Sequence, residues 1–185
     1  MREPWCQTGT ETDPVNADDP ASRGASETIV KVASQHGVRG AIVRLPPTVH
    51  GEGDHGFVPQ LIAIARASRV AAFVGDGENR WPAVYRNDAA TLFRLAVERG
   101  DPGAVFHAVA EQGIPMRHIA EVIGRGLGVP TRSLDLSEAP AHFTWMARFV
   151  QIDNPVTIDR TQRALGWRPT QKGLIADLEE SGYFT

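Results

Sequence analysis

Residues 38–57 constrain the fold of this chain more than any other stretch. An apolar run at 40–43 leads to Arg44, then to a Leu-Pro-Pro turn, and then to a loop rich in glycine, acids and histidine. Proline fixes φ and has no N–H group, so Pro46 and Pro47 hold the turn in one shape. Open α/β sheets form their ligand crevices at the carboxyl ends of strands, where such turns and polar loops follow.

Helical and extended patterns alternate along the rest of the chain. Apolar spacing predicts helices over 22–36, 57–67, 88–99 and 115–123, with shorter ones around 137–149, 158–165 and 172–180. Apolar extended runs predict strands at 38–43, 70–74, 81–85 and 105–109. This alternation with short connections predicts an α/β fold with a mostly parallel sheet.

Local sequence signals predict where two of these helices begin and which side of the first one faces the core. Ser22 is expected to cap the first helix, and its apolar side chains, which include Ile29 and Val32, are expected to face the core. Asp88 is interpreted as a cap of the third helix, because Asn and Asp accept hydrogen bonds from free N–H groups at helix starts.

Composition narrows the class of protein. The first 20 residues are polar and are expected to form an extension, with residues 21–185 forming one domain. The net charge of −3 argues against a nucleic-acid partner, and no apolar run reaches the roughly 20 residues that cross a membrane. The single Cys6 lies in the polar tail and fits a reducing cytoplasm.

Two further patterns contain residues typical of a metal site or of a dinucleotide-binding turn, but neither has the spacing or position that such a site needs. His50, Asp54 and His55 lie close together, yet no H-E-x-x-H or C-x-x-C spacing accompanies them, so a polar loop is preferred to a metal site. The glycines at 124–128 follow a helical pattern and are interpreted as its end. The Gly-rich turn between a strand and a helix that grips a dinucleotide phosphate is missing.

Three segments resemble the C-terminal half of an extended short-chain dehydrogenase/reductase, in the NAD-dependent epimerase/dehydratase family. Residues 44–51, Arg-Leu-Pro-Pro-Thr-Val-His-Gly, are similar to the family's Arg-Pro-x-Asn-Val-Tyr-Gly loop, with one residue more. Residues 83–90 resemble its Phe-Val-His-Val-Asp-Asp-Val-Ala segment, and 163–169 resemble its late Lys-x-Leu-Gly-Trp-x-Pro signature. The resemblance implies the C-terminal half of a Rossmann-like, doubly wound parallel sheet with a small, mostly helical substrate region.

The resemblance also implies roles for particular residues. NAD or NADP would be the cofactor, and the loop formed by Pro46, Pro47, Thr48 and Val49 would lie beside its nicotinamide. A small-molecule substrate would be bordered by five side chains: His50, Asn79, Arg80, Trp81 and Tyr85. Arg44 fits either an ion pair at the end of a strand or a ligand contact.

The catalytic pair of the family is where this sequence departs from the pattern. Relatives carry Tyr-x-x-x-Lys, in which the Tyr is the general acid/base and the Lys lowers its pKa. At that spacing residues 23–27 read Arg-Gly-Ala-Ser-Glu, and Lys31 lies one helical turn after Glu27. This pattern is similar to atypical members of the family, so the catalytic residues stay unassigned.

Three functions are therefore open. The chain could be the substrate side of an atypical NAD(P)-dependent oxidoreductase or epimerase-like protein, a non-catalytic dinucleotide-binding regulator, or an inactive truncated product. Without the phosphate-gripping turn we expect weak or absent cofactor binding by this chain alone. An incomplete sheet would expose apolar surface, and a homo-oligomer is a possible consequence.

Overall fold

The structure, a computed structural model, describes residues 8–15 and 23–185. Its strands are β1 (Ile42–Arg44), β2 (Thr48–His50), β3 (Ala71–Val74), β4 (Arg80–Tyr85), β5 (Val105–His107), β6 (Glu111–Pro115) and β7 (Thr131–Leu134). Its helices are α1 (Gly24–Gln35), α2 (Phe57–Ser68), α3 (Arg86–Arg99), α4 (Met116–Leu127), α5 (Ala139–Phe143), the 3-10 helix η1 (Thr144–Arg148), α6 (Asp159–Leu165) and α7 (Leu174–Glu180). Mixed strands and helices with parallel pairing confirm the predicted α/β class.

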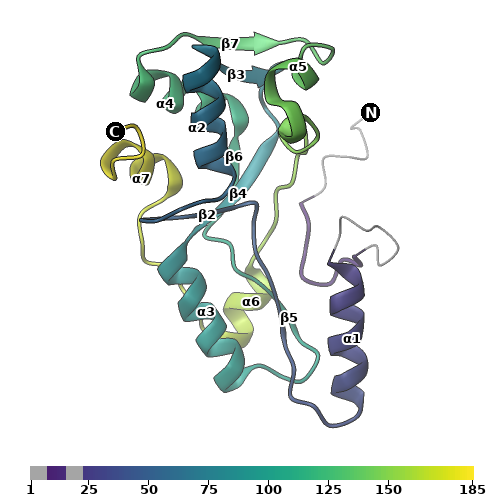
Figure 1. The fold of residues 1–185 in the computed structure, drawn as a ribbon. Helices are drawn as coiled ribbons and strands as arrows, with labels where there is room; N and C mark the ends of the chain where they lie inside the picture. Colours follow the sequence, from purple (N-terminus) through teal and green to yellow (C-terminus); the bar gives the residue numbers. More distant parts are fainter. Residues whose placement is uncertain (1–7, 16–22) are drawn as a thin grey trace.

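The strands form three small sheets (Figure 1). β1 pairs with β5, β2 with β4, and β3 with β7, all in parallel, while β6 adds to β4 in the antiparallel direction. The chain leaves the first sheet at Arg44 and enters the second at Thr48, so the proline turn is the crossing between two sheets.

Two hydrophobic clusters lie on either side of the central strands. In Figure 1 the upper part holds α2, β3, α4, β7 and α5, the lower part holds α3, β5 and α6, and β2 and β4 lie between them. Along β4, Trp81 and Ala83 belong to the upper cluster, whereas Val84 belongs to the lower one. The alternation of side chains along a strand explains how β4 serves both clusters.

The predicted elements are largely present, but three strands were missed. β2, β6 and β7 contain the sequences Thr-Val-His, Glu-Gln-Gly-Ile-Pro and Thr-Arg-Ser-Leu, which lack an apolar run. β2 was expected to be loop, yet Thr48 and His50 are both buried and pair in register with β4. Pairing with a neighbouring strand, rather than local propensity, decides these segments.

The apolar side of α1 faces the core only in part, because Val30 and Ala33 are half-buried but Ile29 and Val32 are exposed. Ile29 is 70% exposed and Val32 is 48% exposed, whereas Glu27 is buried. The helix turns Glu27 inward because its carboxylate pairs with Arg44 at the end of β1. The expected cap, Ser22, lies outside the described residues.

Asp88 is not a helix cap, because its side chain holds the C-terminal tail. Its carboxylate oxygens accept hydrogen bonds from the backbone N–H groups of Thr170 (3.0 and 3.1 Å) and Gln171 (2.9 Å). The indole N–H of Trp167 donates to the backbone carbonyl of Asp88 at 3.1 Å. The residue that matches the family's acid is thus an anchor for the late Leu-Gly-Trp-Arg-Pro segment.

The glycines of α4 serve packing as well as termination. Only Gly128, with φ of +65°, ends the helix, because glycine tolerates a left-handed conformation. Gly124 and Gly126 lie inside the helix, where a Cβ atom would collide with Thr131 and with the ring of Phe184, respectively. The prediction that the whole run stops the helix is therefore wrong for the first two glycines.

Residues 8–15 lie against the body of the protein. The N–H of Gly9 donates to the carbonyl of Pro155 at 2.8 Å, and the buried Glu11 accepts hydrogen bonds from the N–H and hydroxyl of Thr161, both at 2.8 Å. Cys6 lies outside the described residues, and so does the domain boundary at residue 20, which stays a prediction.

Candidate functional site

The proline turn is fixed at its start by an ion pair. Arg44 donates from Nε to Oε1 of Glu27 (2.8 Å) and from its guanidinium to Oε2 (2.9 Å), a two-pronged contact. The Arg44 hydrogen bonds lower the pKa of Glu27 and outweigh its burial, so the carboxylate is charged at neutral pH. Of the two interpretations of Arg44, the ion pair at the strand end is the one that the structure contains.

Thr48 leaves one polar atom of the turn without a partner. Pro46 and Thr48 are buried, and Pro47 and Val49 are half-buried. Within the described residues, the buried hydroxyl oxygen of Thr48 has no hydrogen-bond partner. A buried polar group without a partner costs free energy, and a ligand amide could satisfy it.

His50 points away from solvent and binds the C-terminal helix. Its Nδ1 lies 2.9 Å from Oδ2 of Asp177, and both side chains are buried. Its ring meets Tyr85 edge to face, with centroids 5.3 Å apart. Among the described residues, Nε2 of His50 has no partner. His50 therefore joins β2 to α7, and its expected contact with a substrate stays a prediction.

Asp177 is the shared hydrogen-bond acceptor for several polar side chains of the C-terminal segment and for His50. Burial would raise the pKa of Asp177, but hydrogen bonds from His50, Ser181 and Lys172 together lower it. The hydroxyl of Tyr183 lies 3.4 Å from Asp177 Oδ2, accepts the N–H of Gly51 at 3.1 Å, and reaches the Gly51 carbonyl at 3.2 Å. The tail is thereby fastened to the loop that follows β2.

Asn79 and Arg80 bind the segment that follows η1. The side-chain amide of Asn79 donates to the carbonyls of Val150 (2.9 Å) and Ile152 (3.2 Å). Arg80 contacts Asp153 through Nε (3.0 Å) and through its guanidinium (2.8 Å). The Arg80 contacts lower the pKa of Asp153. Both side chains thus hold the chain around residues 150–153, and their expected contact with a substrate stays a prediction.

An aromatic group extends from the core to the surface beside these residues. Trp81 is buried, and its ring lies 5.7 Å from that of Phe57. Phe57 also meets Phe149 at 5.1 Å and Trp145 at 5.9 Å, and Trp145 is 57% exposed. Trp81 itself is a core residue, whereas Trp145, which the sequence analysis missed, offers a ring to solvent.

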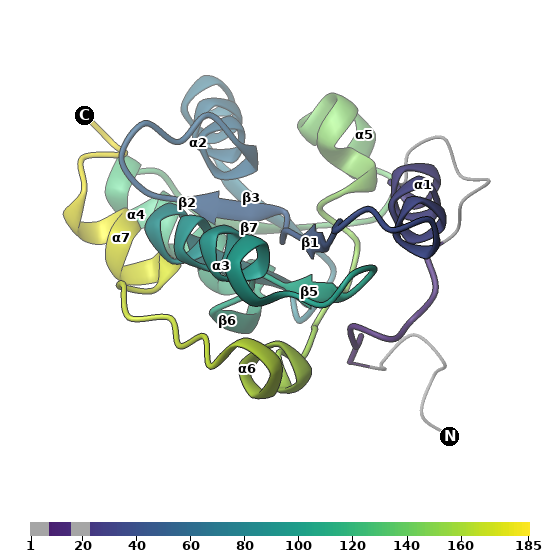
Figure 2. The same ribbon diagram turned by 90° about the horizontal axis from the view of Figure 1, so that it is seen from below.

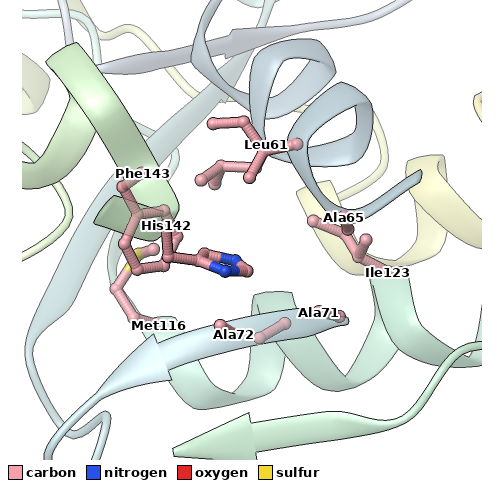
Figure 3. A pocket seen from close by; sticks show the side chains of 10 residues that line it. Leu61, Ala65, Ala71, Ala72, Met116, Ile123, His142 and Phe143 are labelled. Carbon is pink, nitrogen blue, oxygen red and sulfur yellow. The ribbon is translucent and has the colours of Figure 1, made fainter. Parts of the chain in front are cut away.

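A small apolar cavity lies between α2, β3, α4 and α5 (Figure 3). Leu61, Ala65, Ala72 and Ile123 are among its walls, and the imidazole of His142 points into it. The cavity holds about 10 Å³ of space for a water molecule, which is the lower limit for one. Burial lowers the pKa of His142, so its ring is neutral at pH 7. With the ring in place the cavity has no room for a substrate.

A larger pocket of about 330 Å³ lies beside the loop that follows β2. The loop residues Gly51 to Asp54 form one wall, α2 forms the second, and residues 181–183 form the third. Figure 2 shows the loop before α2 and the C-terminal segment on the same side of the molecule. The sequence predicted the loop, but gave no signal that the tail closes the pocket, where Tyr183 contacts Gly51 across 132 positions of the chain.

Lys31 and Tyr183, two side chains of the types found in the family's catalytic pair, lie in α1 and in the C-terminal segment, respectively. Lys31 pairs with Glu27 at 3.7 Å. Burial raises the pKa of Tyr183, and the nearby Asp54 and Asp177 raise it further. A Tyr that serves as acid/base near neutral pH needs a lowered pKa, whereas the pKa of Tyr183 is raised.

Residues 8–15 and 23–185 contain neither a membrane-spanning helix nor a cluster of metal ligands. No helix there is long and apolar enough to cross a bilayer. No group of three or more His, Cys, Asp or Glu side chains there is placed to hold a metal ion, and this includes His50, Asp54 and His55.

Comparison with known proteins supplies the family. Residues 8–114 match the model of the NAD dependent epimerase/dehydratase family. The chain belongs to this family. It is 49% identical over 177 residues to an uncharacterized protein of Schizosaccharomyces pombe, covering 95% of this chain and 59% of the relative. It is 28% identical over 130 residues to 2-alkyl-3-oxoalkanoate reductase of Stenotrophomonas maltophilia, covering 66% of this chain and 39% of the relative.

Solved structures of the family share the fold at low identity. A dTDP-glucose 4,6-dehydratase from Streptomyces venezuelae with NAD bound superposes with a TM-score of 0.69 and 18% identity, covering 94% of this chain and 54% of its own. RMD from Pseudomonas aeruginosa, complexed with NADPH, gives 0.58 and 16%, covering 95% and 63%. A nicotinamide dinucleotide is thus a cofactor within the family. The chain spans about three-fifths of the length of the first relative.

Proposed function

We propose that this chain forms the nicotinamide-side loop and substrate region of an atypical NAD(P)-dependent oxidoreductase or epimerase-like protein. The observation that carries the proposal is the buried Thr48 hydroxyl directly after the Pro46-Pro47 turn, which has no hydrogen-bond partner among residues 8–15 and 23–185. A nicotinamide carboxamide carries both a donor and an acceptor, either of which a hydroxyl can satisfy. Family membership and the distant reductase support a redox role.

The residues present fit one end of the cofactor only. Pro46, Pro47, Thr48 and Val49 would hold the nicotinamide, and the bound cofactor would supply hydride transfer. The sequence contains no Gly-rich turn followed by a helix N-terminus of the kind that binds the pyrophosphate. The phosphates would therefore need a binding site supplied from outside these 185 residues. We therefore expect the isolated chain to bind NADH or NADPH weakly or not at all.

A second candidate is a non-catalytic dinucleotide-binding protein. The raised pKa of Tyr183 and the pairing of Lys31 with Glu27 favour it, since neither side chain is placed to transfer a proton as the family's pair does. An inactive truncated product is the remaining alternative.

Saturation-transfer NMR with NADH tests the first proposal. Because the contact is at one end, the nicotinamide protons should receive saturation while the adenine protons receive little. Thr48→Val should remove the signal, and Thr91→Val, an exposed threonine on α3, should keep it. Saturation centred on adenine, micromolar affinity of the isolated chain by calorimetry, or an unchanged Thr48→Val signal would contradict the proposal.

A further inference from the structure

The 330 Å³ pocket beside the 51–54 loop has no part in the proposed function. Its volume lies within the range of about 300–1,000 Å³ that is usual for small-molecule sites. Three separate parts of the chain build it, and hydrogen bonds between Tyr183 and the backbone of Gly51 hold two of its walls together. The pocket is therefore a fixed feature of the fold.

One end of the pocket carries a half-buried acid, Asp54. Its Oδ1 accepts the N–H of Gly56 at 2.6 Å while Oδ2 lies 3.4 Å from the Tyr183 hydroxyl. Burial raises the pKa of Asp54 above its usual value, and the nearby hydrogen bonds only partly offset this. A carboxylate that is costly to ionise gains from a cation placed beside it.

The other end carries a cation. Arg66 lies near the end of α2, and within the described residues its side chain makes one hydrogen bond, from the guanidinium to the carbonyl of Phe184 at 3.1 Å. A guanidinium has five N–H donors in a planar fork, so Arg66 keeps several for a ligand carboxylate.

An apolar stretch of α2 separates the two charges. Pro59, Ile62 and Ala63 line the pocket between them and project from the same side of the helix as Arg66. The Asp54 carboxylate lies at the start of α2, where it accepts the N–H of Gly56, and Arg66 is ten positions further along, which corresponds to about 15 Å of helix. An α-amino acid, whose own charges are adjacent, is too short to contact both side chains, even if the Arg66 side chain reaches back along the helix.

We propose that this pocket binds a small, elongated molecule with a cation at one end, an anion at the other and a short apolar middle. The ammonium of such an ω-amino acid would lie against Asp54, its carboxylate against Arg66, and its methylene groups over Ile62. The site is separate from the nicotinamide-side turn, and its binding does not require the cofactor.

The probe for this proposal is 6-aminohexanoate, titrated into the 185-residue chain and followed by calorimetry and NMR. Hexylamine and hexanoate each keep the methylene chain but only one charge. We expect 6-aminohexanoate to bind at least about tenfold more tightly than either, because each lacks one charge-assisted hydrogen-bonding end.

Four variants locate the binding. Asp54→Asn and Arg66→Gln should each weaken it about tenfold or more, and Ala63→Leu should block it by filling the middle of the pocket. Arg94→Gln is the matched control, since Arg94 is exposed on α3 and pairs only with Glu98 among the described residues. Circular dichroism and thermal melts show that each variant is folded.

Three results would overturn the proposal. Absence of binding up to about 20 mM probe, a concentration that detects even millimolar affinity, would reject the site. Equal affinity for hexylamine or hexanoate would reject the two-charge ligand. Equal loss in Arg94→Gln would show that the binding is not at this pocket.

Discussion

Asp88 offers the sharpest test of how the C-terminal tail is held. Asp88→Ala removes the acceptor of two backbone N–H groups, those of Thr170 and Gln171. Hydrogen bonds to a charged group each contribute about 1.5–3 kcal/mol. Both donors belong to exposed residues that water can reach, so we use the lower end of that range. With two such bonds at about 1.5 kcal/mol each, the expected loss in the free energy of unfolding is about 3 kcal/mol.

Chemical denaturation followed by Trp fluorescence measures this loss. For a chain of this size each kcal/mol lowers Tm by roughly 2–4 °C, so thermal melts should show a drop of roughly 6–12 °C. Asn87→Ala, at the exposed neighbouring position, is the control and should change stability by less than about 0.5 kcal/mol.

Asp88→Asn separates the two interpretations of this residue. Asn and Asp are equally good helix caps, so a cap would lose almost nothing. A tail anchor would lose about 1 kcal/mol or more, because the amide NH₂ cannot accept the bonds that the second oxygen accepts. A neutral Asp88→Asn variant, or an Asp88→Ala variant as stable as the parent, would refute the anchor.

Three more results are expected. The pKa values of Glu27 and Asp153 are lowered in the folded state, so as the pH falls the unfolded chain takes up protons before the folded one. The free energy of unfolding measured in urea should therefore be highest above about pH 5 and fall at lower pH. A free energy of unfolding that does not change with pH would contradict this. Light scattering should show self-association that Ile29→Lys with Val32→Lys reduces, and a monomeric parent would count against it. Gly126→Ala should loosen the tail, seen as faster amide exchange at its end, unless Phe184 moves without cost.

The elements with strong local signals were predictable. The helix expected at 57–67 is α2 (Phe57–Ser68), and the strand expected at 70–74 is β3 (Ala71–Val74), because apolar spacing there agrees with the packing. β2 was missed, because its polar Thr48 and His50 are buried by strand pairing and by a partner from α7.

Only the part of the site formed by the loop after β1 could be predicted from the sequence. The loop after β1 was recognised from prolines and glycines, which act locally. Its partners, Asp177 and Tyr183, come from the far end of the chain and have no local pattern that marks them. The predicted orientation of α1 was wrong in part for a similar reason. The ion pair between Glu27 and the distant Arg44 determines which side of the helix faces the core, rather than the apolar side chains of the helix itself.

The two hydrophobic clusters also give the protein two separate optical reporters of unfolding. Trp81 is buried in the cluster around α2 and α4, and Trp167 is buried in the cluster around α3 and α6. Replacing Trp5, Trp145 and one of these two buried indoles with phenylalanine leaves a single Trp that reports on its own half. If the halves open as separate cooperative units, the two fluorescence transitions will fall at different denaturant concentrations. If they coincide, the shared strand β4 couples both halves into one transition.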